Sequence, residues 1–520
     1  MDARWDVSRV ISKRASLTPE KTAIIFEDTP VTYRELYFGA NRFARYLISK
    51  GMKKGDRLSM VALNCVEFLE VYFACARLGI IFVPLNWRLT APELQYQIND
   101  SGAKMIVFQD AFIPSLAPIK SSVKVDHWVY LTGFMPGLPP CPDWAEDYAL
   151  VKNLSEEELP QPEPVYLNDP LAIVYTSGVT GNPKGAVLSH GQTYFKIFQI
   201  ALYTGGGPEN VILAQLPLFH SGGLFIVATP SLMGGATMIM RAGFDPNQFA
   251  EDIERYKANV VFALTTMWRF VLSSGKLDTV DVSSVQTVVG GGERTPPSLF
   301  TDLAARGLYL QQGFGQTECS AMTVMPVADI QRKMGSVGKP GAFVHIWVGN
   351  AQGEELKRGQ IGEIMAQGPT VMSGYWNLPE KTREAIAPTG ALYTGDLGYM
   401  DDEGFLYIVD RAKDMYRSGG ENVYPAEVEK VLASHPEVAN AAIVGVPDDK
   451  WGETGMAFVL PLMGKSPTEA DIRTWLDGRL AKYKHPTHIT FVADLPYTAT
   501  MKIKKADLKA EAKKLLAEKA

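Results

Sequence analysis

The chain has 520 residues, of which 46% are hydrophobic and 21% are charged, and its formal net charge is -6 at pH 7. This length predicts several packed domains or subdomains, and the composition is typical of a soluble globular protein. The negative charge argues against bulk nucleic-acid binding.

The N-terminus and the cysteines indicate the same compartment. The opening residues, MDARWDVSRVISKR, contain no apolar core, so we expect no secretory signal. Cys65, Cys75, Cys141 and Cys319 show no C-x-x-C spacing. They predict reduced thiols in a cytoplasmic protein rather than a disulfide framework.

Short apolar runs alternate with helical patterns through the first part of the chain. We expect strands at 21–27, 57–63, 80–85 and 103–109, and helices at 32–49 and 91–102. This alternation predicts an α/β fold with mostly parallel sheets.

The most apolar segment runs from Val61 to Leu85. Because Glu67, Glu70 and Arg77 interrupt it, a core helix that leads into a strand is expected rather than a membrane span. We therefore expect no integral membrane segment.

The middle of the chain continues the α/β pattern. It predicts a helix at 244–257 and strands at 259–265, 285–292 and 307–315. The last two strands end in glycine-rich loops. Ligands of open α/β sheets lie beyond the carboxyl ends of strands, so these loops are candidates for one site.

The character of the sequence changes near residue 410. Residues 401–410 predict a hairpin with Gly404 in its turn, and the following strands and helices predict a small α+β domain. We expect an N-terminal domain at 1–410 and a mobile C-terminal lid at 411–520. Within the lid, Ser466 is expected to cap a helix that starts at Pro467, with Glu469 completing a capping box.

The stretch YTSGVTGNPKG, from Tyr175 to Gly185, has the chemistry of an anion-binding loop. Its glycines allow close backbone approach, its hydroxyls donate hydrogen bonds, and Lys184 brings a positive charge. It matches neither the P-loop pattern nor the Rossmann pattern. An ordinary glycine-rich surface turn is the alternative, and composition alone does not decide between them.

Further motifs follow this loop in order. LPLFH ends at His220, GFGQTE at Glu318 and YTGD at Asp396, DRAKDMYRSGGENVYPAEVE spans 410–429, and LPYTATMKI contains Lys502. With the loop, these motifs resemble those of the adenylate-forming superfamily, which comprises acyl-CoA synthetases, adenylation domains and luciferases. The resemblance covers nearly the whole chain and is greatest to fatty-acyl-CoA synthetases. It implies ATP, Mg²⁺ and coenzyme A as cofactors.

The resemblance also implies a role for individual residues. Catalysis would involve Lys502, His220, Thr317 and Glu318, with Glu318 also holding Mg²⁺. ATP would be bound by Thr176, Ser177, Gly178, Val179, Thr180, Gly181, Lys184, Gly291, Gly292, Glu293, Phe314, Asp396 and Arg411. Coenzyme A would contact Gly419, Gly420, Trp451, Tyr483 and Lys484, and Lys413 would lie at the hinge of the lid.

Several of these residues have plainer alternatives. His220 could be a satisfied core histidine, Phe314 a core side chain and Lys413 a solvated charge. Only its motif context separates Lys502 from Lys504 and the other lysines of the tail.

Two residues depart from the pattern of the superfamily. Val179 replaces the usual serine or threonine of the phosphate loop, which removes one hydroxyl donor. Met501 replaces the usual glycine just before the catalytic lysine. We still expect activity, because backbone N–H groups and the other hydroxyls remain.

The expected activity is that of an acyl-CoA synthetase for an apolar acid, either a medium- or long-chain fatty acid or an aryl acid. Its acyl pocket is expected from HSGGLF, FALTTMW, VVGGG and CSAM, which are almost uncharged. A stand-alone enzyme that loads a carrier protein, a luciferase-type oxidation and a non-catalytic nucleotide-binding descendant are the alternatives. The sequence leaves undecided whether the protein forms a homodimer.

Overall fold

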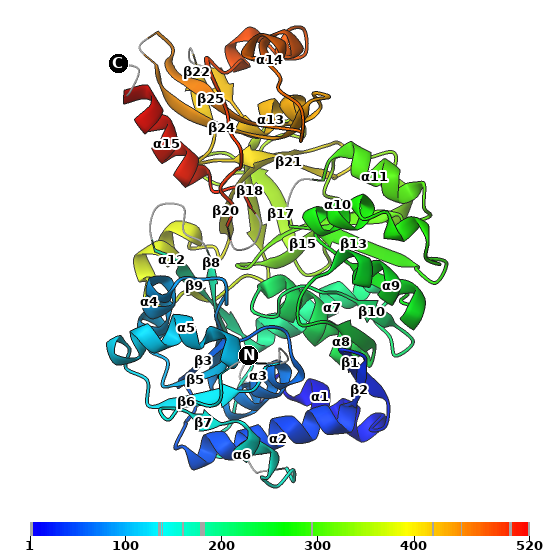
Figure 1. The fold of residues 1–520 in the computed structure, drawn as a ribbon, viewed down its shortest axis with the longest axis vertical. Coiled ribbons are helices and arrows are strands. Elements are labelled where there is room, and N and C mark those ends of the chain that lie inside the picture. Colours follow the sequence, from blue (N-terminus) through cyan, green and yellow to red (C-terminus); the bar gives the residue numbers. More distant parts are fainter. Residues whose placement is uncertain are drawn as a thin grey trace. The chain divides into compact units, whose positions relative to one another are not determined.

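The computed structural model describes residues 4–133, 137, 139–158, 161–176, 182–292, 295–418, 421–448, 450–498 and 502–517. Figure 1 shows the chain coloured along the sequence. It divides into two compact units, residues 1–345 with 366–392, and residues 346–365 with 393–520. The boundary predicted between residues 410 and 411 is that of a mobile lid. The division into compact units does not test which residues move, so this boundary stays a prediction.

Within the described residues, one sheet of the first unit has nine strands. In spatial order they are β16 (Lys339–Pro340), β15 (Ser320–Val324), β14 (Leu310–Gln316), β13 (Thr287–Gly291), β12 (Val260–Phe262), β10 (Val211–Leu213), β11 (Thr237–Met240), β1 (Thr22–Phe26) and β2 (Thr29–Thr32). The pairs from β14 through β12 and β10 to β1 are parallel, and β2, β15 and β16 add antiparallel edges. The predicted mostly parallel sheet is confirmed.

The described part of the first unit contains a second sheet, of eight strands. Their order is β19 (Gly374–Tyr375), β9 (Lys184–Ser189), β8 (Pro170–Thr176), β4 (Ile81–Pro84), β3 (Arg57–Val61), β5 (Met105–Gln109), β6 (His127–Leu131) and β7 (Glu146–Asp147). The strands from β8 to β7 pair in parallel, whereas β8 and β9 form an antiparallel pair. The anion-binding loop predicted from the sequence is the connection within this antiparallel pair.

Helices join the strands of the first unit. They include α1 (Arg9–Leu17), α2 (Tyr33–Ser49), α3 (Val66–Leu78), α4 (Ala91–Ser101), α7 (His190–Thr204), α8 (Thr229–Gly234), α9 (Pro246–Tyr256), α10 (Thr265–Ser273), α11 (Pro297–Ala304) and α12 (Pro379–Ala385). The apolar segment at 61–85 is α3 followed by β4, as predicted from its charged interruptions. Among the described residues, no helix is both long and apolar enough to cross a membrane.

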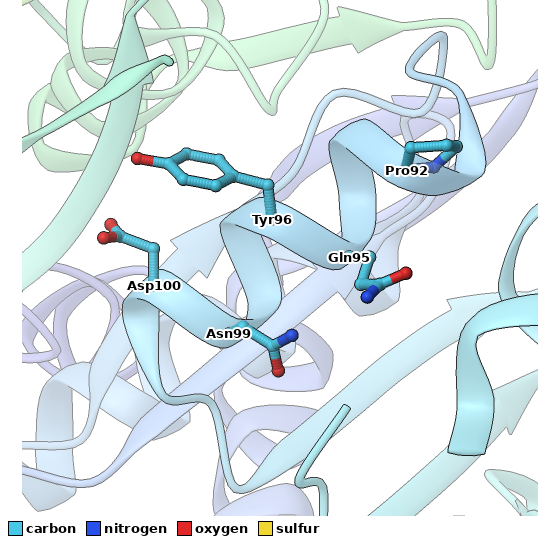
Figure 2. A pocket seen from close by; sticks show the side chains of 5 residues that line it. All are labelled: Pro92, Gln95, Tyr96, Asn99 and Asp100. Carbon is cyan, nitrogen blue, oxygen red and sulfur yellow. The ribbon is translucent and has the colours of Figure 1, made fainter. Parts of the chain in front are cut away.

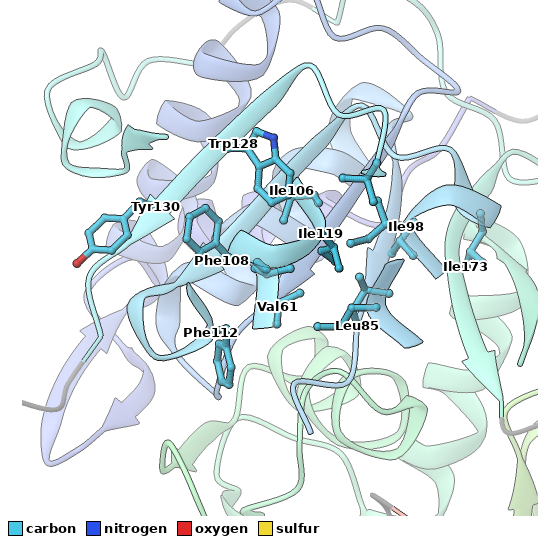
Figure 3. Close-up of a cluster of buried hydrophobic side chains, with 14 of the residues drawn as sticks. Val61, Leu85, Ile98, Ile106, Phe108, Phe112, Ile119, Trp128, Tyr130 and Ile173 are labelled. Carbon is cyan, nitrogen blue, oxygen red and sulfur yellow. The ribbon is translucent and has the colours of Figure 1, made fainter. Parts of the chain in front are cut away.

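One core of the first unit lies on the second sheet. Figure 3 shows that Phe108 and Trp128, from neighbouring strands, point into the same cluster as Ile98 of α4. Strands covered on both faces read as continuous apolar runs rather than alternating ones. β5 is buried along its whole length, which fits its nearly continuous apolar sequence.

The second unit contains two smaller sheets. One has the order β17 (His345–Gly349), β18 (Gly362–Gln367), β20 (Leu392–Met400) and β21 (Leu406–Arg411). The other has the order β23 (Glu421–Val423), β22 (Tyr416–Ser418), β25 (Gly452–Pro461) and β24 (Val438–Asp448), with β26 (His488–Phe491) also beside β25. The helices α13 (Pro425–Ala433), α14 (Glu469–Leu476) and α15 (Lys505–Ala517) belong to this unit. The predicted α+β character of the C-terminal region is confirmed.

The predicted start of α14 is wrong. The helix begins at Glu469, and its N-cap is Thr468, whose hydroxyl accepts from the Asp471 backbone N–H while the Asp471 carboxylate accepts from the Thr468 N–H. Glu469 instead pairs with Arg473 one turn later, at 2.6 Å. The sequence offers two overlapping capping boxes, and the second one forms.

Candidate active site

The two ends of the predicted phosphate loop lie side by side. Strands β8 and β9 place Thr176 opposite Lys184, with 3.3 Å between the Thr176 hydroxyl and the Lys184 carbonyl oxygen. Five predicted ATP ligands between them lie outside the described residues: Ser177, Gly178, Val179, Thr180 and Gly181.

Helix α4 supports both ends of this loop. The Tyr175 hydroxyl donates to the Asp100 carboxylate at 2.6 Å, and the Tyr96 hydroxyl donates to the Pro183 carbonyl at 3.3 Å. Figure 2 shows Tyr96 and Asp100 on α4, where residues 92, 95, 96, 99 and 100 line an open hollow of about 560 Å³. These bonds connect the residues on both sides of the loop to α4.

Glu318 lies at the same place as the ends of the loop. Its Oε1 accepts a hydrogen bond from the Tyr375 hydroxyl at 2.9 Å and lies 3.5 Å from the Thr176 hydroxyl. The Lys184 ammonium lies 4.2 Å from the centre of the Tyr375 ring. The structure thus brings Glu318 to Thr176 and Lys184, from which it is far apart in the sequence.

Tyr375 is a residue of this site that the sequence did not reveal. It belongs to the two-residue strand β19, which pairs antiparallel with β9 and places Tyr375 opposite Ala186. So short a strand leaves no periodic pattern. Only the pairing with β9 shows that this hydroxyl reaches Glu318.

Thr317 and the histidine motif are also joined. The Thr317 hydroxyl lies 3.0 Å from the Ser221 hydroxyl, and both side chains are buried. His220 itself is exposed, and its Nδ1 accepts from the Gly222 backbone N–H at 3.1 Å. The alternative of a core histidine is therefore excluded, whereas the catalytic role of His220 stays a prediction.

The ATP-binding residues predicted at 291–293 and at Phe314, which would border the adenine, are described only in part. Gly291 lies opposite Gly313 in the parallel pair of β13 and β14, and a Cβ atom on Gly291 would lie 2.5 Å from the Gly313 carbonyl oxygen. Close strand packing therefore already requires glycine there. Gly292 has a φ of +85°, and Phe314 is buried, which suits core packing as well as an adenine contact. Glu293 lies outside the described residues.

An unpredicted cation lies close to Glu318. Lys196 of α7 is 1% exposed, and α7 packs against β15 and against the π-helix η3 (Gly222–Ala228) that follows His220. Burial lowers the pKa of Lys196 to about 8, although the neighbouring Cys319 and Glu318 act in the opposite direction. Burial also raises the pKa of the Cys319 thiol to about 11.

In the second unit, Asp396 and Arg411 form an ion pair. The Arg411 Nε lies 2.6 Å from the Asp396 Oδ1, with 6% of the Asp396 side chain and 43% of the Arg411 side chain exposed. The pair joins β20 to β21, where the two residues are directly opposite. Burial raises the pKa of the nearby Glu363, and the charge of Asp396 adds to this effect.

Lys502 closes a turn in the second unit. Its backbone N–H donates to the Thr498 hydroxyl at 3.0 Å, its carbonyl accepts from the Thr498 N–H at 2.6 Å, and its side chain is exposed. Met501 lies outside the described residues. Lys413 is also exposed, and its carbonyl accepts from the Lys509 ammonium at 3.3 Å.

The predicted coenzyme A residues lie in the second unit. Trp451 is 46% exposed in the turn between β24 and β25, and the Lys450 ammonium lies 4.7 Å from its ring centre. Tyr483 is exposed, and the Lys484 ammonium binds the Glu427 carboxylate at 2.6 Å. Gly419 and Gly420 lie outside the described residues.

A metal site built from protein side chains alone is not found in the part of the chain that the structure describes. No group of three or more histidine, cysteine or acidic side chains is placed to hold an ion there. Mg²⁺ commonly uses one or two carboxylates together with substrate phosphates and water. Glu318 fits that kind of site, because its carboxylate lies at the ends of the predicted phosphate loop.

Comparisons with known proteins match both parts of the chain. Residues 11–376 match the family described as AMP-binding enzyme, and residues 427–502 match the AMP-binding enzyme C-terminal domain. The chain is 35% identical to a feruloyl-CoA synthase from an Amycolatopsis species, over 96% of this chain and 97% of that one. It is 33% identical to the long-chain-fatty-acid–CoA ligase FadD13 of Mycobacterium tuberculosis, over 97% and 98%.

A solved structure is similar to nearly the whole of this chain. It is the o-succinylbenzoate CoA synthetase of Bacillus subtilis in complex with its acyl-adenylate intermediate, with a TM-score of 0.86 and 32% sequence identity. The likeness covers 96% of this chain and 97% of that one.

Proposed function

The chain belongs to the AMP-binding enzyme family and is an ATP-dependent carboxylate–CoA ligase, and we propose that it activates an acid with a largely apolar acyl or aryl body. The acid would react with ATP to give an acyl-adenylate and pyrophosphate. The thiol of coenzyme A would then attack the adenylate and release AMP. The free thiols suit a reducing compartment, so we place the enzyme in the cytoplasm.

The proximity of Thr176, Lys184 and Glu318 is the observation that best supports this chemistry. Adenylation joins two anions, so the site must offset negative charge where it develops. In our proposal Lys184 and the loop from Thr176 bind the β- and γ-phosphates, and Thr317 donates to the α-phosphate. Glu318 holds Mg²⁺, which would neutralise phosphate charge when bound. Tyr375 orients the Glu318 carboxylate through the bond that its hydroxyl donates.

The second unit supplies the ribose ligand and the catalytic charge. Asp396 would accept hydrogen bonds from the ribose hydroxyls, and its pairing with Arg411 holds the carboxylate in one orientation. Lys502 would stabilise the charge that concentrates between the carboxylate and the α-phosphate in the transition state. Gly291, Gly292 and Phe314 would border the adenine.

The second half-reaction would use another face of the C-terminal domain. Trp451, which is largely exposed at a hairpin turn, is suited to stack on the adenine of coenzyme A. Lys413 would be the hinge for the change of orientation. Lys484 would contact the nucleotide only in competition with Glu427, which already holds its ammonium group.

The predicted acyl pocket supports an apolar substrate body. Leu224 and Phe225 of η3 and Trp268 of α10 are buried, as are the glycines at the end of β13. The related ligases act on both aryl and fatty acids by their names, so both classes remain in the proposal. Loading of a carrier protein would require a thiol partner other than coenzyme A and is the alternative.

A screen of carboxylic acids tests this proposal. The protein is incubated with ATP, Mg²⁺, coenzyme A and one acid at a time, drawn from fatty and aryl series, and AMP and thioester are measured by mass spectrometry. We expect equal amounts of AMP and acyl-CoA from at least one series. Adenylate formation without thioester would favour the carrier-protein alternative, and the absence of AMP from every acid would contradict the proposal.

A further inference from the structure

Lys196 is buried in a way that its role in the fold does not explain. With 1% exposure it is among the largest fully buried side chains of the described chain, beside Trp, Tyr and Phe residues. Within the described residues no hydrogen bond or ion pair of Lys196 is found, and its neighbours are the carboxylate of Glu318 and the thiol of Cys319, which burial keeps neutral near pH 7. Burying an ammonium group without a hydrogen-bonding or charged partner is strongly unfavourable.

Asp252 shows how a buried charge is satisfied elsewhere in this chain. Asp252 is fully buried, and its carboxylate binds Arg241 through both the Nε and the Nη2 atoms, at 2.9 and 2.5 Å. It accepts a further bond from the Gln248 amide at 3.0 Å. Lys196 lacks such partners among the described residues, and a ligand could supply them.

The position of Lys196 indicates which ligand. Helix α7 packs against η3 and β15, which contain two of the stretches expected to line the acyl pocket. Glu318 and Cys319 immediately precede β15. Lys196 therefore has Glu318 as its charged neighbour and lies on a helix that packs against two segments expected to line the acyl pocket.

We infer that Lys196 binds a second oxygen acceptor of the substrate, a hydroxyl, phenolate or carboxylate carried by the acyl or aryl body. This inference rests on the proposed CoA-ligase function and makes its substrate class narrower: an apolar acid with one further polar group. A site that hydrogen-bonds a substrate group rejects analogues that lack it, because the site is then left with an unpaired buried group.

Matched acids test the inference. Cinnamate is compared with 4-hydroxycinnamate and 4-carboxycinnamate, and octanoate with octanedioate, in the formation of acyl-CoA by the intact enzyme. For at least one pair the wild type should favour the acid with the second acceptor, measured as the ratio of kcat/KM. Lys196→Met, which is apolar and similar in length, should reduce that ratio about 10- to 100-fold by weakening only the substituted acid. Lys196→Gln, which keeps a donor, should restore part of the preference.

A second variant on the same helix is the control. Gln199 is also 1% exposed, but its amide is satisfied by the Ala321 carbonyl and by the Phe343 N–H. Gln199→Met should lower the melting temperature and leave the substrate ratio unchanged. Lys196→Met should keep or raise the melting temperature, because it removes an unpaired buried charge.

The outcomes separate this inference from the proposed function. Turnover of plain acids with no preference in any pair, or an equal loss for all acids in Lys196→Met, would overturn the role of Lys196 and leave the ligase function standing. An equal loss for all acids would mean that Lys196 acts by holding the Glu318 carboxylate in place. Failure of every acid with the wild type would reject the ligase function itself, and with it the inference.

Discussion

Replacement of Lys502 by alanine should separate the two half-reactions. The lysine is proposed to act only while the acid and the α-phosphate react, when charge is most concentrated. Loss of a preorganised charge at such a point costs ~3–4 kcal/mol, which corresponds to about a 10²- to 10³-fold slower adenylation. The attack of coenzyme A on a supplied acyl-adenylate should be nearly unchanged.

The structure indicates that slower adenylation in Lys502→Ala would come from the lost ammonium group and not from a disturbed fold. The Lys502 side chain is exposed, and the bonds that close its turn come from its backbone N–H and carbonyl, which alanine keeps. Substitution at such a position changes the free energy of unfolding by about 0.5 kcal/mol or less. The variant should therefore fold and melt like the wild type.

Single-turnover adenylation, followed as acyl-AMP after rapid quenching, measures the first half-reaction. Thioester formation from synthetic acyl-adenylate and coenzyme A measures the second. The matched control is Lys504→Ala, because Lys504 is also exposed and lies two residues along the same segment. Equal losses in both half-reactions, or an equal effect of Lys504→Ala on adenylation, would refute the assignment.

Three further predictions concern other parts of the molecule. Trp451→Ala should raise the KM for coenzyme A about 10-fold, since base–aromatic stacking contributes ~1–3 kcal/mol, and should leave ATP–pyrophosphate exchange intact; collapse of the exchange would mean that Trp451 supports the fold. Asp396→Asn should raise the KM for ATP by about 10- to 100-fold through loss of charge-assisted hydrogen bonds, and should reduce the discrimination against 2′-deoxy-ATP; unchanged discrimination would remove Asp396 from the ribose site. Burial, and then the charge of Glu67, raise the pKa of Glu70 from 4.5 to about 7. The contribution of Glu70 to stability should therefore be full below pH 4.5 and be lost as pH rises through 7. Glu70→Gln should raise the free energy of unfolding at pH 8 by up to ~3 kcal/mol but not at pH 4.5, as measured by denaturant titration; equal stability of the two proteins at pH 8 would contradict this.

The sequence predicted elements whose signal is local. The segment at 61–85 has its charges at a spacing that allows a buried helix, and α3 followed by β4 is what forms. The cap of α14 was mispredicted because Ser466 and Thr468 each have an acidic residue three positions later. Such neighbouring capping boxes differ little in local free energy, so packing around the helix decides between them.

The site was predictable only where a motif marks it. The loop at 175–185 and Glu318 were found by their motifs, and the structure brings the described ends of the loop to that carboxylate. Tyr375 and Lys196 have no such mark. Tyr375 reaches Glu318 only through the pairing of β19 with β9, and Lys196 occupies a helix position whose burial depends on η3 and β15. Both are consequences of tertiary packing between segments far apart in the sequence.

Oxygen transfer from the acid to AMP tests the central claim, activation through an acyl-adenylate, most directly. The acid is labelled with ¹⁸O in both carboxylate oxygens and converted to acyl-CoA by the enzyme with ATP and Mg²⁺. Attack of the carboxylate on the α-phosphate leaves one labelled oxygen on that phosphorus when coenzyme A displaces AMP. We predict AMP with one ¹⁸O atom for each acyl-CoA formed. Unlabelled AMP, or ADP with label in inorganic phosphate, would contradict the account.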